Sequence, residues 1–448
     1  MSLTFYGGVG EIGGNKIRVK DDDTCIFFDF GKNFERERRF FDQPYLAPRE
    51  EKHLFALGIL PYFDGLYKYD EIESDVDGII LSHAHTDHTG YVGFVKDEVP
   101  IYCSELTKKF MIARDYSSTS SLVKYRVAIM RTSGNEIVKD FTKMNTQEEV
   151  SINEIKIKRF DVDHSIPGAS AFIYELAGNK IAYTGDLRQH GDNKNTEDFL
   201  KNAETDDIDI LITEGTNVEN ADLHTEEKVS QEFHELLSAT NRCTIVSSSL
   251  NDFDRLNTIF ETTKACDKKL VISIKQAFIL SQISEEGKYK LIDLNDDDLA
   301  IFQRQKSRDY EWEKTIIGKY GVHHCNDFKD EQDNLVLMAS FFDMNEMCDF
   351  QPKSGAQYVI SQSEPHNEEM EIDRWKLMNW LENYGLPSYS IHCSGHIRPL
   401  ELMQMIERIH PKKIIPIHTE RPKIFEKFVG DLGIDVDLPM EGKPIVLN

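Results

Sequence analysis

The sequence predicts an α/β protein whose parts are built in different ways. Short apolar or alternating segments, which are typical of β-strands, dominate residues 1–216, and helical patterns are sparse there. Residues 217–365 alternate helix and strand, which is the pattern of a parallel sheet. Residues 366–448 begin with a helix and then return to strands separated by helices. We therefore predict three consecutive segments with boundaries near 216 and 365.

The strands of the first segment follow from the polarity of its residues. Residues 16–20 alternate between apolar and polar side chains, and residues 24–30 form an almost continuous apolar run. The same reasoning predicts further strands at 78–82, 99–103, 155–162, 171–176, 180–184 and 208–213. Helices are predicted only at 105–116 and 121–131.

The remaining elements follow each other more regularly. From 217 onward, helices are predicted at 224–239, 252–265, 275–286, 369–384, 399–409 and 422–432. Strands are predicted at 243–248, 269–273, 334–339, 356–361, 389–393, 413–417 and 444–447. Trp375 and Trp380 fall in one of these helices, and we expect them in its core-facing side.

The composition is that of an ordinary globular protein. Of 448 residues, 40% are hydrophobic and 29% are charged. No apolar run approaches the roughly 18 residues of a spanning helix. The N-terminus also lacks the features of a secretory signal. We therefore expect a cytoplasmic location and no membrane partner. Seven scattered cysteines without a Cys-x-x-Cys pair favour reduced thiols over a disulfide framework and exclude a zinc knuckle or a thioredoxin-type site.

The net charge taken alone argues against a nucleic-acid partner. Lys and Arg number 52 against 78 Asp and Glu, which gives −26 at pH 7, whereas nucleic-acid-binding domains are usually basic. Net charge governs solubility and long-range steering, however, and a local groove of opposite sign can still hold phosphates. Basic clusters occur at 36–39, 108–109, 304–308 and 412–423, and we expect most of them to be solvated faces.

One octet, residues 81–88, carries the strongest chemical signal. It reads Leu-Ser-His-Ala-His-Thr-Asp-His and directly follows an apolar strand. His83 and His85 are two residues apart, so they point to the same side of an extended segment. Asp87 and His88 fall on the turn that follows, where they can face a second metal ion. Histidine and carboxylate side chains are common metal ligands, so the octet predicts a metal site.

Four side chains do not complete two metal sites, and further candidates occur at the ends of other predicted strands. They are His164, Asp186 and His418. Each is weak evidence alone, because a histidine at a strand end is often structural. All three stand at the end of a predicted strand, as the octet does, and this shared location supports a common site.

The octet resembles the His-x-His-x-Asp-His signature of the metallo-β-lactamase superfamily, position for position. Ser394-Gly395-His396 and the segment 211–216 around Glu214 resemble motifs of the β-CASP ribonucleases in that superfamily. The glycine-rich segment 7–15 resembles the ribonuclease J group more narrowly. Thr419 and Gly215 depart from the usual residues at their positions but leave the ligands intact.

The resemblance implies an αββα sandwich formed by 1–216 and 366–448, with a β-CASP α/β domain, 217–365, inserted into it. It also implies a short form without the C-terminal domain of many ribonuclease J proteins. RNA is expected in the cleft between the two domains. The implied activity is 5′-to-3′ exoribonuclease cleavage of single-stranded RNA from its 5′ end, with a 3′-end-processing endoribonuclease as the alternative. A homodimer is left open.

The resemblance further implies a site with two divalent ions, zinc by ligand type with manganese as the alternative. One ion would take His83, His85 and His164, and the other Asp87, His88 and His418, with Asp186 bridging. Two such ions activate water and clamp a phosphate in line. Asp87, His396 and Glu214 are the implied catalytic residues: His396 contacts or protonates the reacting groups, while Glu214 and Asp29 orient side chains.

Three weaker signals remain. Residues 8–13 match G-x-G-x-x-G, but a strand rather than a helix follows, so we expect a hairpin near the cleft and no nucleotide cofactor. Ser247, Ser248 and Ser249 precede a helix and form either a substrate-phosphate site or an ordinary N-cap cluster. Ser394 and Gly395 precede the predicted helix 399–409, and we expect them to bind substrate phosphate there. A small-molecule hydrolase and a non-catalytic RNA-binding protein are rival hypotheses with less support.

Overall fold

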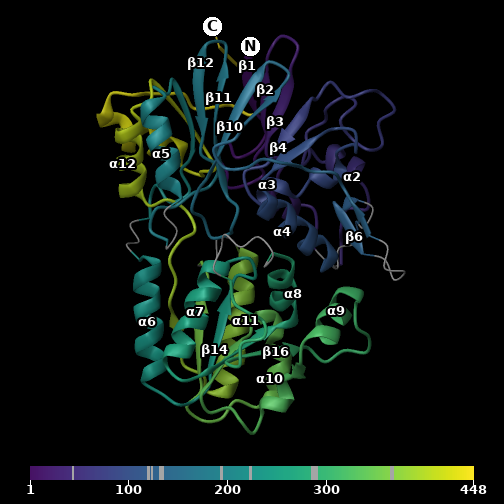
Figure 1. Ribbon diagram of the computed structural model, residues 1–448, viewed down its shortest axis with the longest axis vertical. Coiled ribbons are helices and arrows are strands. Elements are labelled where there is room, and N and C mark those ends of the chain that lie inside the picture. The colour runs from purple at the N-terminus through teal and green to yellow at the C-terminus, as the bar shows by residue number, and fades with distance from the viewer. Residues whose placement is uncertain are drawn as a thin grey trace.

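Three seven-stranded sheets organise the chain. The computed structural model describes residues 1–42, 45–118, 122, 125–130, 136–191, 195–220, 224–283, 291–363 and 368–447. Two of the sheets pack together in a first lobe, and the third sheet with its helices forms a second lobe (Figure 1). The N- and C-terminal ends lie close together in the first lobe, far from the second.

The first sheet is mixed. β1, β2 and β3 run antiparallel, and β3, β4, β5 and β8 run parallel. Its order is β23 (Ile445–Val446), β1 (Ser2–Phe5), β2 (Ile17–Lys20), β3 (Cys25–Phe28), β4 (Gly78–Ile80), β5 (Ile101–Cys103) and β8 (Thr142–Lys143).

The second sheet is also mixed, with an antiparallel meander from β9 to β12 and parallel pairing from β12 to β22. Its order is β22 (Asp435–Val436), β21 (Lys413–Ile417), β13 (Ile210–Glu214), β12 (Asn179–Tyr183), β11 (Ser170–Leu176), β10 (Ile155–Asp161) and β9 (Glu149–Ile152).

Apolar side chains that alternate along these short strands bury themselves between the two sheets. Phe28 of β3 stacks on Tyr174 of β11, with ring centroids 5.0 Å apart, and contacts Phe172 at 5.2 Å. Helices cover the outer faces, with α5 and α12 over one sheet and α2, α3 and α4 beside the other (Figure 1). The predicted αββα layering of mixed sheets is therefore confirmed.

The helices of this first lobe are short for the most part. They are α1 (Phe34–Arg38), α2 (Glu51–Ala56), α3 (Thr86–Thr89), α4 (Glu105–Tyr116), α5 (Thr196–Thr205), α12 (Pro399–Ile409) and α13 (Pro422–Val429). A two-stranded ribbon of β6 (Ala128–Met130) and β7 (Glu136–Val138) lies apart from the sheets. The prediction of a helix at 121–131 is wrong at 128–130, because these residues pair antiparallel with β7. Residues 121, 123–124 and 131 of that prediction lie outside the described residues.

The third sheet is entirely parallel, as the alternation of helix and strand predicts. Its order is β17 (Val322–His324), β16 (Leu299–Gln303), β15 (Lys269–Ser273), β18 (Leu335–Met338), β14 (Thr244–Ser248), β19 (Gln357–Ser361) and β20 (Ser388–Ser390). Its helices are α6 (Glu226–Ser238), α7 (Phe253–Ala265), α8 (Ile274–Ile283), α9 (Glu311–Lys319), α10 (Met347–Phe350) and α11 (Glu368–Tyr384).

The second lobe holds more of the chain than the segment 217–365. β20 pairs with β19, and Leu377 and Leu381 of α11 are buried in the core of this lobe. The predicted boundary at 365–366 lies outside the described residues. We propose a three-part division in which the chain returns to the first lobe after β20, and not near 365.

The prediction that both tryptophans of α11 lie in the core is wrong for Trp375. This side chain is 65% exposed, whereas Trp380 is partly buried and stacks on Tyr384. Residues five apart on a helix are separated by about 140° around its axis, so they do not share one face.

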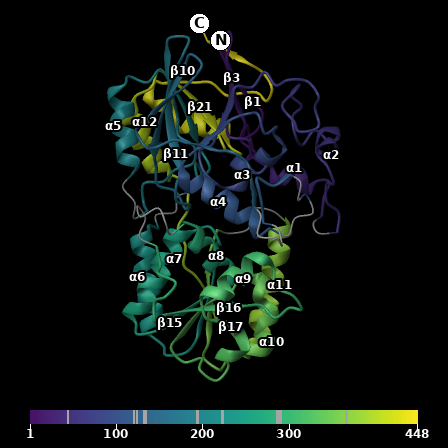
Figure 2. The ribbon, with the colours of Figure 1, turned by 45° about the vertical axis from the view of Figure 1, so that its right-hand side comes forward.

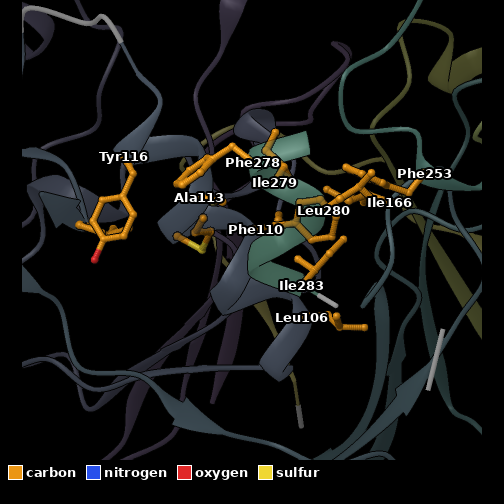
Figure 3. Close-up of a cluster of buried hydrophobic side chains, with 14 of the residues drawn as sticks. Leu106, Phe110, Ala113, Tyr116, Ile166, Phe253, Phe278, Ile279, Leu280 and Ile283 are labelled. Carbon is orange, nitrogen blue, oxygen red and sulfur yellow. The ribbon is translucent and has the colours of Figure 1, made fainter. Parts of the chain in front are cut away.

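An apolar cluster joins the two lobes (Figure 3). Leu106, Phe110 and Ala113 of α4 face Phe278 and Ile283 of α8. The Phe110 ring also contacts the ring of Phe253 in α7, with centroids 5.2 Å apart. Figure 2 shows the same helices meeting from a second direction. This continuous core fixes the second lobe against the sandwich.

Among the described helices, none is both long enough and apolar enough to cross a membrane.

Replacing Phe110 with alanine is expected to loosen the junction of the lobes. The side chain is only 3% exposed, and removing a buried phenylalanine costs about 3–5 kcal/mol of unfolding free energy. Urea unfolding followed by circular dichroism measures the change. Phe342→Ala is the matched control, because Phe342 is 71% exposed. Equal unfolding midpoints for the two variants would contradict this account of the junction.

Candidate metal centre

The octet after β4 folds as its spacing predicts. The chain stays extended through His85, which is the N-cap of the short helix α3, and Asp87 and His88 fall in the first turn of that helix. The side-chain Nε2 of His83 lies 3.1 Å from Nδ1 of His85. His83 and His85 therefore point to one place, and Asp87 and His88 are carried to a neighbouring one.

His164 completes a triad with the first two histidines. It follows β10, and its Nε2 lies 3.1 Å from Nδ1 of His85. Tetrahedral zinc with nitrogen ligands places the ligand atoms about 3.3 Å from one another. The three imidazoles thus stand at a spacing that suits one cation.

A second group consists of Asp87, His88, Asp186 and His418. Nε2 of His418 lies 3.1 Å from Oδ2 of Asp87, and Nε2 of His88 lies 3.1 Å from Oδ2 of Asp186. Asp186 follows β12 and His418 follows β21, two strands of the second sheet. One ligand atom from each residue of this group lies within 4.8 Å of the others.

Asp186 stands between the two groups. Its Oδ2 is 3.6 Å from Nε2 of His418 and 3.8 Å from Nε2 of His83, in addition to its contact with His88. One carboxylate is thus shared by both sets of ligands. The seven residues that the sequence predicts as ligands all meet. Asp186 lies between the two groups, and its bridging of two ions stays a prediction.

Hydrogen bonds on the outer side orient the rings. Asp29 accepts from Nδ1 of His88 at 2.8 Å and from the Ser82 hydroxyl at 2.8 Å. The Ser82 oxygen in turn lies 3.0 Å from Nδ1 of His83. With Nδ1 protonated in both rings, Nε2 presents its lone pair to the centre, which is how outer partners commonly orient metal-binding histidines.

Two of the three remaining rings, those of His164 and His418, are held in the same way. The Thr216 hydroxyl lies 2.8 Å from Nδ1 of His418, and the backbone carbonyl of Gly395 accepts a hydrogen bond from Nδ1 of His164. Asp29 also accepts from the Tyr183 hydroxyl at 2.6 Å. The sequence predicted an orienting role for Asp29 but gave no signal for such a role of Tyr183, in the predicted strand 180–184, or of Thr216, in the segment 211–216.

The donor set fits divalent cations. Nε2 of His88 and both side-chain oxygens of Asp186 are buried, yet they hydrogen bond to nothing in the described part of the chain. Burial lowers the pKa of His85 to about 4 and holds those of His83 and His164 well below the usual value, so these rings are neutral at pH 7. Converging lone pairs and unpaired carboxylate oxygens are costly when buried, and a bound cation removes that cost.

His396 lies at the edge of this centre. Its Nδ1 is 2.9 Å from Oε2 of Glu214 and 3.8 Å from Oδ2 of Asp186. Burial disfavours the imidazolium, but the negative charges of Glu214 and Asp186 outweigh that effect and raise the pKa of His396 to about 9. Glu214 is fully buried and also accepts from the backbone N–H of Leu187 at 2.9 Å. The sequence predicts that Glu214 orients side chains of the site, and the side chain it contacts is His396.

Ser394 and Gly395 lead into this position. The Ser394 hydroxyl oxygen accepts from the backbone N–H of His396 at 3.1 Å and from the Asn217 amide at 2.9 Å. A Cβ atom on Gly395 would lie 2.8 Å from the Ser165 hydroxyl, so only glycine fits there. Both residues therefore shape the His396 loop, and their predicted contact with substrate phosphate stays a prediction.

The glycine-rich segment 7–15 joins antiparallel β1 and β2, which confirms the predicted hairpin. The backbone N–H of His418 donates to the Gly8 carbonyl at 2.7 Å. Gly13 has φ of +77°, and a Cβ on it would lie 2.7 Å from Cβ of Asp87. The hairpin thus lies against the metal ligands and needs glycine to do so.

Ser247 and Ser248 are the last two residues of β14, and Ser249 follows them. The helix that follows, α7, is capped by the Asp252 carboxylate, which accepts from the Arg255 backbone N–H. None of the serines is therefore the N-cap. Their binding of a substrate phosphate stays a prediction, and the capping carboxylate disfavours an anion at this helix terminus.

Comparison with known proteins agrees with the geometry. Residues 67–243 match the family model described as β-lactamase superfamily domain. Ribonuclease J of Mycoplasma genitalium is 23% identical over 468 residues, which cover 99% of this chain and 73% of that protein. Cleavage and polyadenylation specificity factor subunit 3 of Dictyostelium discoideum is 28% identical over 245 residues, covering 51% of this chain and 30% of that protein.

A crystal structure of a protein of unknown function from Enterococcus faecalis V583 has the same fold. Its TM-score is 0.77 at 22% sequence identity, and the match covers 100% of this chain and 99% of the other.

Residues 67–243 thus match a β-lactamase superfamily domain, and the fold and the seven converging side chains agree with that match. Over essentially its whole length the chain is similar to proteins named ribonuclease J. The resemblance expected from the octet and from Ser394-Gly395-His396 is confirmed.

Asp186→Ala is expected to disrupt both groups of ligands, because the carboxylate is shared between them. Zinc-loaded wild type should retain about two ions per chain after dialysis, and the variant fewer than one. Metal analysis by inductively coupled plasma mass spectrometry measures the difference. Asp431→Ala, at an exposed position, controls for the loss of one carboxylate. Tight retention of two ions by Asp186→Ala would refute the bridging position.

Proposed function

We propose that the chain is a metal-dependent ribonuclease that hydrolyses RNA phosphodiester bonds, most directly as a 5′-to-3′ exoribonuclease. The observation that carries the proposal is the paired ligand groups that share Asp186, with His396 and Glu214 at their edge. The relatives named above support RNA as the substrate. Zinc is the proposed metal, on the ground that histidine and carboxylate ligands suit it, with manganese as the alternative.

The exposure of the ligands indicates the side from which substrate reaches the centre. His83, His88 and His418 are fully buried, whereas the side chains of Asp87 and His396 are 21% and 23% exposed. Substrate therefore approaches past Asp87 and His396. The buried rings exclude water from the opposite side and keep the ligand atoms in fixed positions.

Two divalent ions bound there would supply an activated water and neutralise charge on the scissile phosphate. The chain itself supplies a proton donor. Glu214 accepts from Nδ1 of His396 and favours the imidazolium, so Nε2 can hold a proton for the leaving oxygen. In this scheme Asp87 orients the attacking water, and Glu214 sets the protonation and direction of His396.

The second lobe favours a polymeric substrate over a small one. The apolar cluster around Phe110 and Phe253 fixes that lobe against the sandwich, and the loop carrying His396 returns from it to the first lobe. A small ester or lactone would not require such an arrangement. We propose that single-stranded RNA lies between the lobes with its 5′ end at the centre. We further propose that the protein acts in the cytoplasm, and a homodimer remains part of the proposal.

The related endoribonuclease activity is the alternative, since it would use the same centre on an internal linkage. Its support is the match to the cleavage and polyadenylation specificity factor subunit. That match covers about half of this chain, whereas the ribonuclease J matches span it almost fully. The exonuclease is therefore the first proposal.

A 5′-labelled single-stranded RNA distinguishes the two activities. With added Zn²⁺ or Mn²⁺, the exonuclease releases labelled mononucleotide from the start of the reaction. Denaturing gels of an early time course show the products, and Asp186→Ala is the inactive control. Long labelled fragments as the first products would support the endonuclease instead, and no metal-dependent cleavage would overturn the proposed function.

His396→Ala is expected to retain its metal ions and to lose turnover. Removing a general acid lowers the rate about 10²- to 10⁴-fold, and His396 is outside both groups that hold the ions in this scheme. Single-turnover cleavage of RNA, with metal analysis of the same sample, tests both parts. His410→Ala, at an exposed position, is the matched control. Cleavage at the wild-type rate would refute the role of His396.

A further inference from the structure

A network of buried charges lies where the two lobes meet. Arg188, Glu226 and Arg255 are each 0% exposed. Arg188 belongs to the loop after β12, in the first lobe, while Glu226 and Arg255 belong to α6 and α7, in the second. Buried charges are costly unless several well-placed partners satisfy them. Such a network across two lobes therefore calls for a reason other than stability.

Arg188 has three carboxylate partners from both lobes. Its Nε donates to Asp163 at 3.2 Å, Nη1 to Glu226 at 3.0 Å and Nη2 to Asp254 at 2.8 Å. Asp163 immediately precedes the ligand His164, and Arg188 follows the ligand Asp186 by two residues. Glu226 and Asp254 lie in the first turns of α6 and α7. One guanidinium thus connects two ligand-bearing loops to two helices of the second lobe.

The network continues toward the loop that carries His396. Arg255 donates to Glu226 at 2.8 Å and to the Ser361 hydroxyl at 2.7 Å. The Cys393 thiol donates to Glu226 at 3.3 Å, and Cys393 directly precedes Ser394. Glu226 is therefore in contact both with the metal-ligand side, through Arg188, and with the chain that leads to His396.

The loop of Arg188 also holds the His396 loop through its other residues. The His190 ring lies 2.8 Å from the Ser394 carbonyl oxygen through Nε2 and 2.9 Å from Glu401 through Nδ1. The Leu187 backbone N–H donates to Glu214, the partner of His396. The five residues 186–190 thus contact the metal centre, the His396 loop and the second lobe.

We propose that Arg188 is a positioning residue that fixes the second lobe, and the RNA it holds, relative to the metal centre. This inference rests on the proposed function. A guanidinium suits the task, because its planar fork makes several directional bonds at once, whereas a lysine ammonium does not reproduce that geometry. Arg188 does not touch the reacting atoms. It acts on the alignment of a substrate that contacts both lobes, and not on one that needs the metal centre alone.

The test compares two substrates with Arg188→Lys. On single-stranded RNA, the variant should lose about 10²-fold in kcat, which is the usual cost of a misplacement of about 1 Å, while KM changes less than about threefold. On bis(p-nitrophenyl) phosphate, a diester too small to reach the second lobe, turnover should stay within about threefold of wild type. Metal content should be unchanged. A merely structural role would lower both activities together.

Arg159→Lys is the matched control. Arg159 is also buried, but it bonds Ser170, Asp161 and the Met144 carbonyl, all within the first lobe. This control should keep both activities. Glu226→Gln removes the partner on the second lobe and should reproduce the selective loss of RNA turnover, even where Arg188→Lys fails to fold. The double variant should lose no more than either single variant, because both remove one shared interaction.

The outcomes separate the two proposals. Parallel losses on RNA and on the small diester, or normal RNA turnover by Arg188→Lys and Glu226→Gln, would overturn the positioning role alone. If wild type hydrolyses the small diester but no RNA, the proposed function fails, and the inference fails with it.

Discussion

The architecture depends on one constraint: residues distant in sequence leave their strands at the same edge of the sandwich. β4 of the first sheet and β10, β12 and β21 of the second end there, and each delivers a ligand-bearing loop. The stacked faces of the two sheets, with Phe28 against Tyr174 and Phe172, fix the distance between those loops. Nothing local holds His418 beside Asp87, which lies 331 residues earlier. The sandwich core does so.

The same convergence has an electrostatic cost. Five imidazoles, four of them buried, and two carboxylates are brought to within a few ångströms of each other, and Asp186 has no hydrogen-bonding partner in the described chain. Asp29, Thr216 and the Gly395 carbonyl satisfy the outer nitrogens and leave the inner lone pairs unsatisfied. Such a cluster is stable only with positive charge inside it. The fold that brings these groups together therefore also creates the need for bound cations.

Local patterns predicted much of this molecule. α4, α12 and β21 have the predicted bounds to the residue, since each is a regular apolar pattern with clear ends. The octet revealed the centre, because four potential metal ligands within six residues are rare by chance. His164, Asp186 and His418 were found by their strand-end positions. The orienting role of Glu214 came from resemblance rather than from pattern.

What sequence reasoning missed depends on contacts between distant segments. Tyr183 reaches Asp29 across 154 residues, and Thr216 reaches His418 across 202, with no local signal for either contact. The attachment of β20 to the third sheet is a pairing choice that its short sequence does not encode. The Arg188 network is likewise invisible, because single arginines and glutamates look like surface residues until the fold buries them.

The most direct test of the central claim is the anomalous diffraction of crystals grown with Zn²⁺, measured on both sides of the zinc absorption edge. The account predicts two peaks about 3.5–4 Å apart, one among His83, His85 and His164 and the other among Asp87, His88 and His418, with Asp186 touching both. A single peak, or peaks held by other residues, would contradict it.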